Sequence, residues 1–591
     1  MQKGVDLLTS GSNPNALKAF QLANKAMLLQ QQRGRVPLRP VEYSKNQPIA
    51  FPDLVLPEPE GGRFGEWRPF QLGFLLLAVS GLVNPLDPSR NEADLLFFPT
   101  GGGKTEAYLG AAAITMFFRR LEDPSHSGVD VLMRYTLRLL TIQQFERSAG
   151  LIVAMEYLRR GQESLLGKTP FSIGVWLGNE TTPNRRADAV AKLRKKGVDD
   201  DGPNPFVLRK CPWCGAQFTY LAGVDSWVGY RAEGSPKTLR FVCADKKNCD
   251  FSSANGALPI WITDDDVYDE RPSFILGTVD KFARLAWEPR ARALFNRGED
   301  GHQQGLPPAL IIQDELHLIS GPLGSLVGLY EAVIDELCSY EIAGQAVRPK
   351  IIASTATTRR FREQVLDLFG REHTALFPQS ITRANETFFS SVATEDDGSP
   401  KKGTAYVGLN PATYQTGQVA ASQVAAAVSQ APTAWGGAQS EIDYYTTAVW
   451  FFNSLKELGQ TLTLMQSTVM SLLSAMWRDA RIPGNNRHLE PMMELTGRVS
   501  AAEVAGALER LALPTSEKNS VTTCLASSIM EVGVDVQRLG LLVIMGQPKM
   551  TAQYIQVSGR VGRDRESGPG LVFMLYNPGR ARDRSIFEQF R

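Results

Sequence analysis

The chain contains 591 residues, 43% of them hydrophobic and 21% charged, and its formal net charge is +1. Domains usually hold roughly 100–200 residues, so this length predicts several domains with separate cores. The composition is that of ordinary globular proteins and excludes a fibrous or extensively disordered chain. The small net charge does not decide whether nucleic acid is a partner, because an acidic surface elsewhere can balance a basic groove.

Hydropathy gives no indication of a membrane location. The longest apolar run, residues 70–83, is shorter than the ~20 residues that span a bilayer, and Gln71 and glycines interrupt it. Residues 1–10 contain Lys3 and Asp6 but no apolar stretch followed by a cleavage site of small residues. We therefore expect a cytoplasmic protein without membrane contact.

The chain divides into four regions by pattern. Residues 1–60 start with helical periodicity and end in a proline-containing segment, which predicts a helical N-terminal lead-in. In residues 61–375 short apolar runs alternate with helical patterns, as expected for a parallel sheet flanked by helices. Residues 376–445 are rich in Ala, Gly, Ser, Thr and Gln, which predicts a linker or insertion. The α/β pattern returns in residues 446–591, so we predict a second domain of the same architecture.

A glycine loop follows the first apolar strand pattern. Residues 95–105 read Leu-Leu-Phe-Phe-Pro-Thr-Gly-Gly-Gly-Lys-Thr and lead into a helical pattern. Glycines let backbone N–H groups approach phosphates, and a helix N-terminus attracts them, so this order favours a phosphate site over a plain flexible turn. We predict an ATP site in which Lys104 reaches the outer phosphates and Thr105 holds Mg²⁺. The predicted phosphate cradle consists of Thr100, Gly101, Gly102 and Gly103.

Two adjacent carboxylates follow a later apolar run. Residues 309–317 read Ala-Leu-Ile-Ile-Gln-Asp-Glu-Leu-His. Because side chains alternate along a strand, Asp314 and Glu315 can serve different purposes. We expect Asp314 to bind Mg²⁺ through its water shell and Glu315 to orient and deprotonate the attacking water, while His317 links the nucleotide to a neighbouring motif. Alone the pattern also fits an acidic turn after a core strand, but together with the glycine loop it predicts a hydrolytic site.

Two arginines near the C-terminus complete the predicted catalytic set. The segment Gln-Val-Ser-Gly-Arg-Val-Gly-Arg, which begins at Gln556, places Arg560 and Arg563 three residues apart and on one face if it is helical. An arginine that meets the γ-phosphate accelerates related reactions by roughly 10³–10⁵-fold. We expect both arginines to reach the nucleotide from the second α/β domain, with Gly533 and Asp535 as further nucleotide-binding residues. A solvent-exposed Gly-Arg loop is the alternative.

These segments resemble the ordered motif series of the superfamily 2 helicases of the DExH type. The segments that correspond are 67–71 (Q motif, with Gln71 reading adenine), 95–105 (I), 134–143 (Ia), 277–282 (Ic), 309–317 (II), 354–357 (III), 451–455 (IV), 527–535 (V) and 556–563 (VI). The resemblance implies an α/β fold with two tandem RecA-like P-loop domains, each with a parallel sheet, and an ATPase that moves on nucleic acid. The residues at the family's nucleic-acid positions are Thr136, Arg138, Thr278, Asn453 and Ser528.

A finer resemblance narrows the expected function. Residues 19–27, residues 314–324 and the embedded cysteines are similar to the DrmA family, the helicases of the bacterial DISARM anti-phage defence system. This implies an ATP-dependent DNA helicase or translocase that works on phage DNA beside a DrmB-like protein partner. The alternative is a DNA clamp, sensor or loading module that uses ATP but does not unwind by itself.

Two cysteine pairs predict a zinc site inside the first α/β domain. Cys211 and Cys214 form a tight pair, and Cys243 and Cys249 form a second, wider one, within an insertion that we place at 185–265. Two thiolate pairs match tetrahedral Zn²⁺ ligation. Disulfides are the alternative, but they fit a cytoplasmic chain poorly.

Basic residues near the insertion leave its role open. A cluster between residues 185 and 196 fits a solvated helix face as well as a phosphate contact, and Lys246 and Lys247 lie beside the second cysteine pair. The insertion therefore either binds nucleic acid or only stabilises the fold of this part of the domain.

Overall fold

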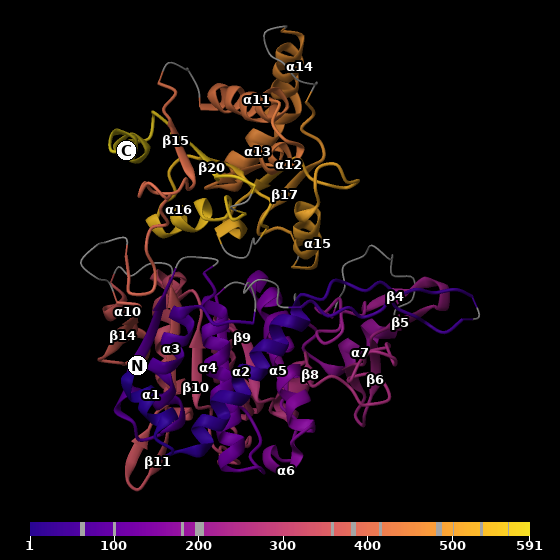
Figure 1. The fold of residues 1–591 in the computed structure, drawn as a ribbon, viewed down its shortest axis with the longest axis vertical. Coiled ribbons are helices and arrows are strands. Elements are labelled where there is room, and N and C mark those ends of the chain that lie inside the picture. Colours follow the sequence, from indigo (N-terminus) through magenta and orange to yellow (C-terminus); the bar gives the residue numbers. More distant parts are fainter. Residues whose placement is uncertain are drawn as a thin grey trace. The chain divides into compact units, whose positions relative to one another are not determined.

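The structure is a computed structural model in which the chain forms two compact units, Met1–Ser391 and Val392–Arg591 (Figure 1). The residues that the structure describes are 1–45, 47–58, 65–98, 102–136, 138–178, 182–194, 206–355, 360–379, 386–412, 417–479, 487–499, 501–531, 536–564 and 567–590. Among the described helices, none combines the length and the hydropathy needed to cross a bilayer.

An eight-stranded sheet organises the first unit. Its strand order is β14-β1-β13-β10-β2-β9-β3-β8, and every neighbouring pair is parallel. The strands are buried along most of their length, as expected when helices cover both faces of a parallel sheet. The bounds are β1 Ala93–Phe97, β2 Val131–Tyr135, β3 Ile173–Trp176, β8 Ile260–Trp261, β9 Phe274–Thr278, β10 Leu310–Gln313, β13 Lys350–Thr355 and β14 Thr374–Phe377.

Helices and short 3-10 turns connect these strands. Asn13 caps α2 by accepting a hydrogen bond from the Ala16 N–H at 2.9 Å, and α2 packs against α4 and α5 through a row of buried alanines. The predicted helical lead-in is therefore part of the first unit. The helices are α1 Gln2–Thr9, α2 Pro14–Gly34, α3 Pro69–Val83, α4 Lys104–Glu122, α5 Arg138–Arg160, α6 Glu163–Leu166, α8 Asp264–Glu270, α9 Gly321–Leu337 and α10 Phe361–Phe369. The 3-10 turns are η1 Pro88–Asn91, η3 Val279–Ala286, η4 Pro289–Phe295 and η5 Leu316–Leu318, and a hairpin pairs β11 Tyr340–Ile342 with β12 Gln345–Val347.

A buried ion pair joins β2 to α9. Arg134 in β2 and Glu331 in α9 form a salt bridge, and their side chains are 0% and 3% exposed. Phe282 and Phe369 flank the guanidinium, with ring centroids 5.5 and 5.9 Å from its central carbon. Burial raises the pKa of Glu331, and the neighbouring arginine opposes this shift. The pair thus depends on both partners being present.

Single substitutions at this pair should weaken the first unit strongly. We expect Arg134→Met or Glu331→Leu alone to destabilise the region around β2 and α9 by about 3–5 kcal/mol, because an uncompensated charge stays buried. The double variant should recover most of that loss. Hydrogen exchange of peptides from β2 and α9 in the full chain measures this, and equal exchange in the single and double variants would contradict it.

The predicted insertion forms a small module between β3 and β8. It contains α7 Arg186–Arg194, η2 Ala222–Val224 and the antiparallel hairpins β4 Thr219–Leu221 with β5 Ser226–Val228, and β6 Tyr230–Glu233 with β7 Thr238–Phe241. Aromatic rings fill it, with Tyr230 in contact with Phe206, Phe218 and Phe241. Figure 1 shows the hairpins beyond the β8 edge of the sheet.

A six-stranded parallel sheet organises the second unit, in the order β15-β20-β19-β16-β18-β17. The strands are β15 Ala405–Leu409, β16 Ala448–Phe452, β17 Met492–Leu495, β18 Thr523–Ala526, β19 Leu541–Met545 and β20 Leu571–Leu575. The helices are α11 Gly417–Trp435, α12 Gln439–Thr446, α13 Leu455–Leu464, the π-helical turn η6 Met465–Val469, α14 Met470–Arg478, α15 Ala501–Ala512, the 3-10 turn η7 Ser528–Glu531, α16 Thr551–Ser558 and α17 Ala581–Glu588.

The region predicted as a linker, 376–445, differs from that expectation. Residues 405–409 form β15, which pairs in parallel with β20, and the alanine-rich stretch after it forms α11. Alanine has the highest helix propensity, and α11 buries alanines such as Ala421 and Ala425 against the second unit's core. Most of this region therefore belongs to the second α/β unit.

Candidate nucleotide and metal sites

The predicted catalytic residues of the first unit meet at the carboxyl edge of its sheet. Strands β1, β13, β10, β2 and β9 are consecutive and parallel, so their carboxyl ends lie side by side. The register pairs Phe97 with Thr355 and Tyr135 with Thr278. In open parallel α/β sheets, ligands bind outside this edge.

The glycine loop is held by the predicted Q motif. Gly103 precedes α4 with φ +94°, and a Cβ there would lie 2.6 Å from Gln71 Nε2, so this position requires glycine. Gln71 Nε2 donates to the Gly103 carbonyl at 2.8 Å, and Arg68 Nη1 donates to the Gly102 carbonyl at 2.5 Å. Gln71 thus contacts the loop directly. Thr100 and Gly101 of the predicted cradle lie outside the described residues.

Lys104 and Thr105 open α4 and are nearly buried, at 8% and 9% exposed. The Lys104 ammonium donates to the Phe98 carbonyl at 2.7 Å, which keeps it at the exit of β1. Thr105 Oγ1 lies 3.0 Å from the hydroxyl of Tyr108, one helical turn further along α4. Both side chains are therefore held at the start of the helix, where phosphate and Mg²⁺ are expected.

Asp314 is brought beside Thr105 by the same tyrosine. The Tyr108 hydroxyl donates to Asp314 Oδ2 at 3.0 Å, while Asp314 Oδ1 accepts from the Ser354 hydroxyl and from the Glu315 N–H at 3.0 Å. Burial, together with the charge of Asp314, raises the pKa of Tyr108 well above its usual value, so the phenol stays protonated. One hydrogen-bonded cluster thus contains Asp314 after β10, Thr105 in the first turn of α4 and Ser354 in β13.

Glu315 follows Asp314 in a left-handed backbone conformation, with φ +50°, and is 8% exposed. His317 Nδ1 lies 3.5 Å from Glu315 Oε2 and 3.4 Å from Thr355 Oγ1 at the end of β13. His317 therefore stands between the predicted base and the strand that leads into the predicted motif III. Residues 356–359, which include the second half of the predicted motif III, lie outside the described residues.

The predicted nucleic-acid residues of the first unit also lie at this edge. Thr136 follows β2 directly, and Thr278 ends β9 with 1% exposure. Arg138 is the first residue of α5, and its side chain lies outside the described residues. The structure places these positions next to the nucleotide cluster, because β2 lies between β10 and β9.

The two arginines of the second unit lie just after a helix. α16 ends at Ser558, so Arg560 and Arg563 occupy the following turn instead of a helical face. Arg560 Nη2 donates to the Glu531 carbonyl at 2.5 Å, and Arg563 Nε donates to the Gly559 carbonyl at 3.1 Å. The helix ends at Gly559, where the backbone leaves the helical conformation with φ −76° and ψ 6°, and Gly562 follows in the turn with φ +75°.

The remaining predicted residues of the second unit lie on several different elements. Gln556 is buried in α16, and Ser528 is exposed at the start of η7. The Asn453 amide donates to the carbonyls of Met545 and Gly546 at 2.9 and 3.1 Å, which gives it a role within the fold. Gly533 and Asp535 lie outside the described residues.

The four cysteines of the insertion form one buried cluster. Cys211 Sγ lies 3.8 Å from Cys249 Sγ, Cys214 Sγ lies 3.5 Å from Cys243 Sγ, and all four sulfurs lie within 4.8 Å of one another. A tetrahedron with Zn–S bonds of about 2.3 Å has edges of about 3.8 Å, so the donor set and its spacing fit zinc. The closest sulfur pairs, at 3.5 and 3.8 Å, are much farther apart than the about 2.05 Å of a disulfide bond, so this geometry favours a metal site over disulfides.

Neighbouring residues brace the cluster. Arg39 Nη1 donates to the Cys214 carbonyl at 2.9 Å, and Arg39 Nη2 lies 2.8 Å from Asp245 Oδ2. The Trp213 indole donates to Asp250 at 2.7 Å and packs against the ring of Tyr157 in α5, with centroids 4.7 Å apart and the rings tilted by 34°. The cysteine loops are thereby attached to the N-terminal segment and to α5.

If the cluster holds zinc, the metal is expected to keep this module folded. We expect Cys214→Ser to lose the bound zinc and to expose residues 206–262 to proteolysis, because structural zinc contributes about 10–16 kcal/mol of apparent binding energy in small domains. Metal content and limited proteolysis of the full chain measure this. Cys338→Ser, at a buried thiol outside the cluster, is the control, and retained zinc in the Cys214 variant would contradict the assignment.

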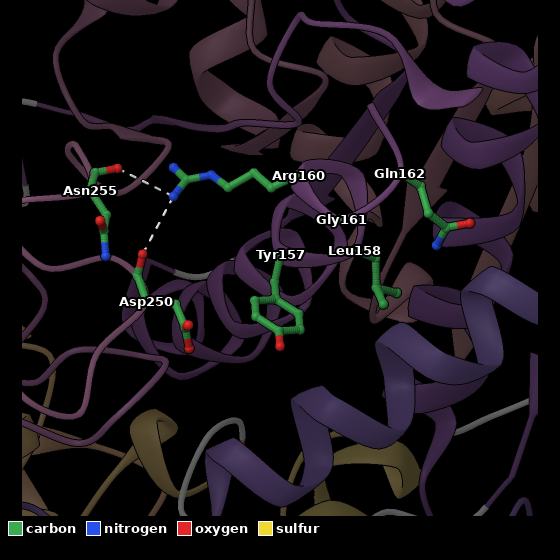
Figure 2. A pocket seen from close by; sticks show the side chains of 7 residues that line it. All are labelled: Tyr157, Leu158, Arg160, Gly161, Gln162, Asp250 and Asn255. Carbon is green, nitrogen blue, oxygen red and sulfur yellow. Dashed lines mark hydrogen bonds between the residues drawn. The ribbon is translucent and has the colours of Figure 1, made fainter. Parts of the chain in front are cut away.

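A pocket of about 650 Å³ lies where α5 ends against the cysteine loops. Figure 2 shows Arg160 reaching from α5 toward the Asp250 and Asn255 carbonyls, at 3.4 and 3.3 Å. Because α5 has 23 residues and rises about 1.5 Å per residue, this pocket is roughly 30 Å from the nucleotide edge. The pocket lies where the insertion module contacts the end of α5.

Several basic residues near the module are used in ion pairs. Arg186 Nε and Nη1 contact Asp266 and Asp269, both at 2.6 Å, and Lys247 contacts Asp53 at 3.0 Å. Within the 185–196 cluster, Arg186 is thus used in ion pairs with α8.

Sequence reasoning missed the two tyrosines of the nucleotide cluster. Tyr108 lies four residues after Lys104, and Tyr135 ends β2 just before Thr136. Helical spacing from the glycine loop was the available signal for Tyr108, since residues three and four apart share a helix face.

The two parallel α/β units and the order of the motifs define the class: the chain is a superfamily 2 helicase protein. The family model "Helicase conserved C-terminal domain" matches residues 454–565. Within the class the chain is DrmA-like. It is 34% identical over 630 residues to the "DISARM protein DrmA" of Bacillus paralicheniformis, and the match covers 100% of this chain and 54% of that protein. The chain therefore spans about half the length of the curated relative that it matches.

Two solved structures are similar at 15% sequence identity. The crystal structure of the DUF1998 helicase MrfA bound to DNA has a TM-score of 0.49 and covers 90% of this chain and 52% of that one. The helicase Lhr of Mycobacterium smegmatis, bound to ssDNA and AMP-PNP, has a TM-score of 0.48 and covers 88% of this chain and 47% of that one.

Proposed function

We propose that the chain is an ATP-hydrolysing motor that moves along DNA as part of DISARM-type anti-phage defence. The observation that carries this proposal is the buried cluster of Thr105, Tyr108 and Asp314 at the carboxyl edge of the first sheet. It joins the start of the glycine-loop helix to the strand that carries the paired carboxylates. The similarity to the DISARM protein DrmA supports the defence role.

The residues have distinct proposed roles in hydrolysis. Lys104 and the N-terminus of α4 stabilise the phosphate charge, and Thr105 with Asp314 holds the Mg²⁺ that ATP brings. Glu315 accepts the proton of the attacking water, and Arg560 and Arg563 stabilise charge on the transferred phosphoryl group. In phosphoryl transfer the protein mainly positions groups and stabilises charge, so this set is sufficient for the chemistry.

Nucleic-acid binding is proposed for Thr136, Arg138, Thr278, Asn453 and Ser528. Contacts of this kind are made with the sugar-phosphate backbone of the nucleic acid. We therefore expect low sequence specificity and an affinity that falls steeply with salt concentration. A DrmB-like partner is proposed to work beside the chain, again from the likeness to DrmA.

ATPase and strand-displacement assays test this proposal. We expect hydrolysis to be stimulated by single-stranded DNA more than by duplex DNA or RNA, and a duplex with a single-stranded end to be unwound. Stimulated hydrolysis without displacement, both alone and with a DrmB-like partner, would favour the clamp or loading module. Hydrolysis that no nucleic acid stimulates would contradict both functions.

A further inference from the structure

Two buried tyrosine hydroxyls form a chain between the proposed Mg²⁺ residues and the end of β2. Tyr108 Oη lies 3.0 Å from Thr105 Oγ1 and 3.0 Å from Asp314 Oδ2. Tyr135 Oη lies 3.3 Å from Tyr108 Oη. Both tyrosines are 0% exposed, so solvent does not compete for these hydroxyls. The other neighbour of the Tyr135 hydroxyl in the described chain is Met133 Sδ at 3.9 Å, a weak acceptor.

The number of protons that each group can donate gives the hydrogen bonds between these hydroxyls a direction. Each hydroxyl has one proton to donate, and an ionised carboxylate only accepts. Tyr108 Oη is placed to donate to Asp314 Oδ2 and to Thr105 Oγ1, and its one proton can serve only one of them at a time. When it donates to Asp314, its lone pairs remain free to accept from Tyr135. The arrangement holds Asp314 and Thr105 at the positions that their proposed task requires.

The far end of the chain lies on the strand that leads to the proposed nucleic-acid residues. Tyr135 is the last residue of β2, Thr136 follows it, and Tyr135 is in register with Thr278 of β9. Strands of a sheet are about 4.8 Å apart, so β2 separates Asp314 from Thr278 by about two such spacings. The hydroxyl chain, which runs from Asp314 after β10 to Tyr135 in β2, therefore spans about one of these two spacings.

We propose that Tyr108 is a positioning residue for the Mg²⁺–nucleotide complex, and that Tyr135 links this complex to nucleic-acid binding at the end of β2. This inference rests on the proposed function. Because coupling between two binding sites is reciprocal, nucleotide should strengthen nucleic-acid binding by the same factor as nucleic acid strengthens nucleotide binding.

The first test uses Tyr108→Phe, which keeps the ring and removes only the hydroxyl. We expect the Mg²⁺ concentration that half-saturates binding of a fluorescent ADP analogue to rise about 10-fold, because a hydrogen bond to a charged group is lost. Binding in EDTA should change by less than about twofold, since the metal-free complex does not use this contact. Unchanged Mg²⁺ dependence in this variant would overturn the role of Tyr108.

Tyr268→Phe is the matched control. Tyr268 is a buried tyrosine of the same unit, and its hydroxyl accepts a hydrogen bond from Trp176 Nε1 at 3.0 Å. The variant loses a buried hydroxyl whose hydrogen bond is to Trp176 of β3. Thermal unfolding of the two variants separates loss of stability from loss of Mg²⁺ binding, because only Tyr108→Phe should change the latter.

The second test measures coupling with Tyr135→Phe. Affinity for a single-stranded DNA oligonucleotide is measured with and without Mg²⁺ and a non-hydrolysable ATP analogue. Allosteric coupling usually amounts to about 5–150-fold, and we expect the nucleotide-induced gain in DNA affinity to shrink at least about fivefold in this variant. The double variant Y108F/Y135F should lose no more coupling than the larger single loss, because the two hydroxyls act as one unit.

The outcomes separate the two proposals. Full coupling in Tyr135→Phe, or losses that multiply in the double variant, would overturn the link through the hydroxyls. A parent chain that binds Mg²⁺ and nucleotide but no single strand would contradict the proposed function together with the Tyr135 link. The Mg²⁺ titration of Tyr108→Phe decides the positioning role in either case.

Discussion

Replacing Glu315 with Gln is expected to lower ATP turnover by about 10²–10⁴-fold, the usual contribution of a general base. Glutamine keeps the size of the side chain and its place in the buried turn after β10, but it cannot take a proton from water. ATP binding should persist, because the loop residues that hold the phosphates are unchanged. Phosphate release at saturating ATP and equilibrium binding of a fluorescent ATP analogue measure the two properties separately.

A glutamate of the same unit provides the control for this variant. Glu336 lies on the exposed side of α9, and Glu336→Gln should hydrolyse ATP at the parent rate. Undiminished hydrolysis in Glu315→Gln would remove Glu315 from the role of base. Equal loss in both variants would point to a general effect of charge.

Arg560→Ala and Arg563→Ala are each expected to reduce hydrolysis by about 10³–10⁵-fold at unchanged or slightly weaker ATP affinity. The reason is that an arginine opposite the γ-phosphate stabilises charge that develops only in the transition state. Arg563→Ala is the cleaner test, since Arg560 also donates to the Glu531 carbonyl and helps to hold η7. Single-turnover hydrolysis with a large excess of enzyme measures the chemical step.

Arg584→Ala, at an exposed position on α17, is the control for the arginine variants. It changes the charge of the same unit by the same amount. Hydrolysis within about twofold of the parent in Arg563→Ala would exclude this residue from the transition state.

Local sequence pattern predicted the elements that surround the candidate sites. The glycine loop between an apolar strand and a helix, and the carboxylates after an apolar strand, are signals of neighbouring residues, and the structure has β1, α4 and β10 at these positions. The paired cysteines also lie together as their spacing predicts. Parallel strands then bring the segments to one edge without further information from the sequence.

Features that depend on contacts between residues far apart in the sequence could not be predicted from the local sequence pattern. An alanine-rich stretch fits a linker as well as a helix, and only pairing between β15 and β20, far apart in the chain, assigns 405–409 to the second sheet. α16 ends at Ser558, before Arg560 and Arg563, and the Gly-Arg pattern alone did not reveal this end. Tyr108 and Tyr135 gain their importance only when α4 packs beside β2 and β10.

The backbone of Glu315 carries a consequence of its own. A φ of +50° is a conformation that costs an ordinary L-amino acid about 1–2 kcal/mol, while glycine adopts it freely and asparagine tolerates it. At this position the proposed chemistry and the shape of the turn thus favour different amino acids. Selection of variants of this chain for thermal stability alone is therefore expected to favour glycine or asparagine at residue 315. Such variants would be more stable but would lack the proposed base for ATP hydrolysis.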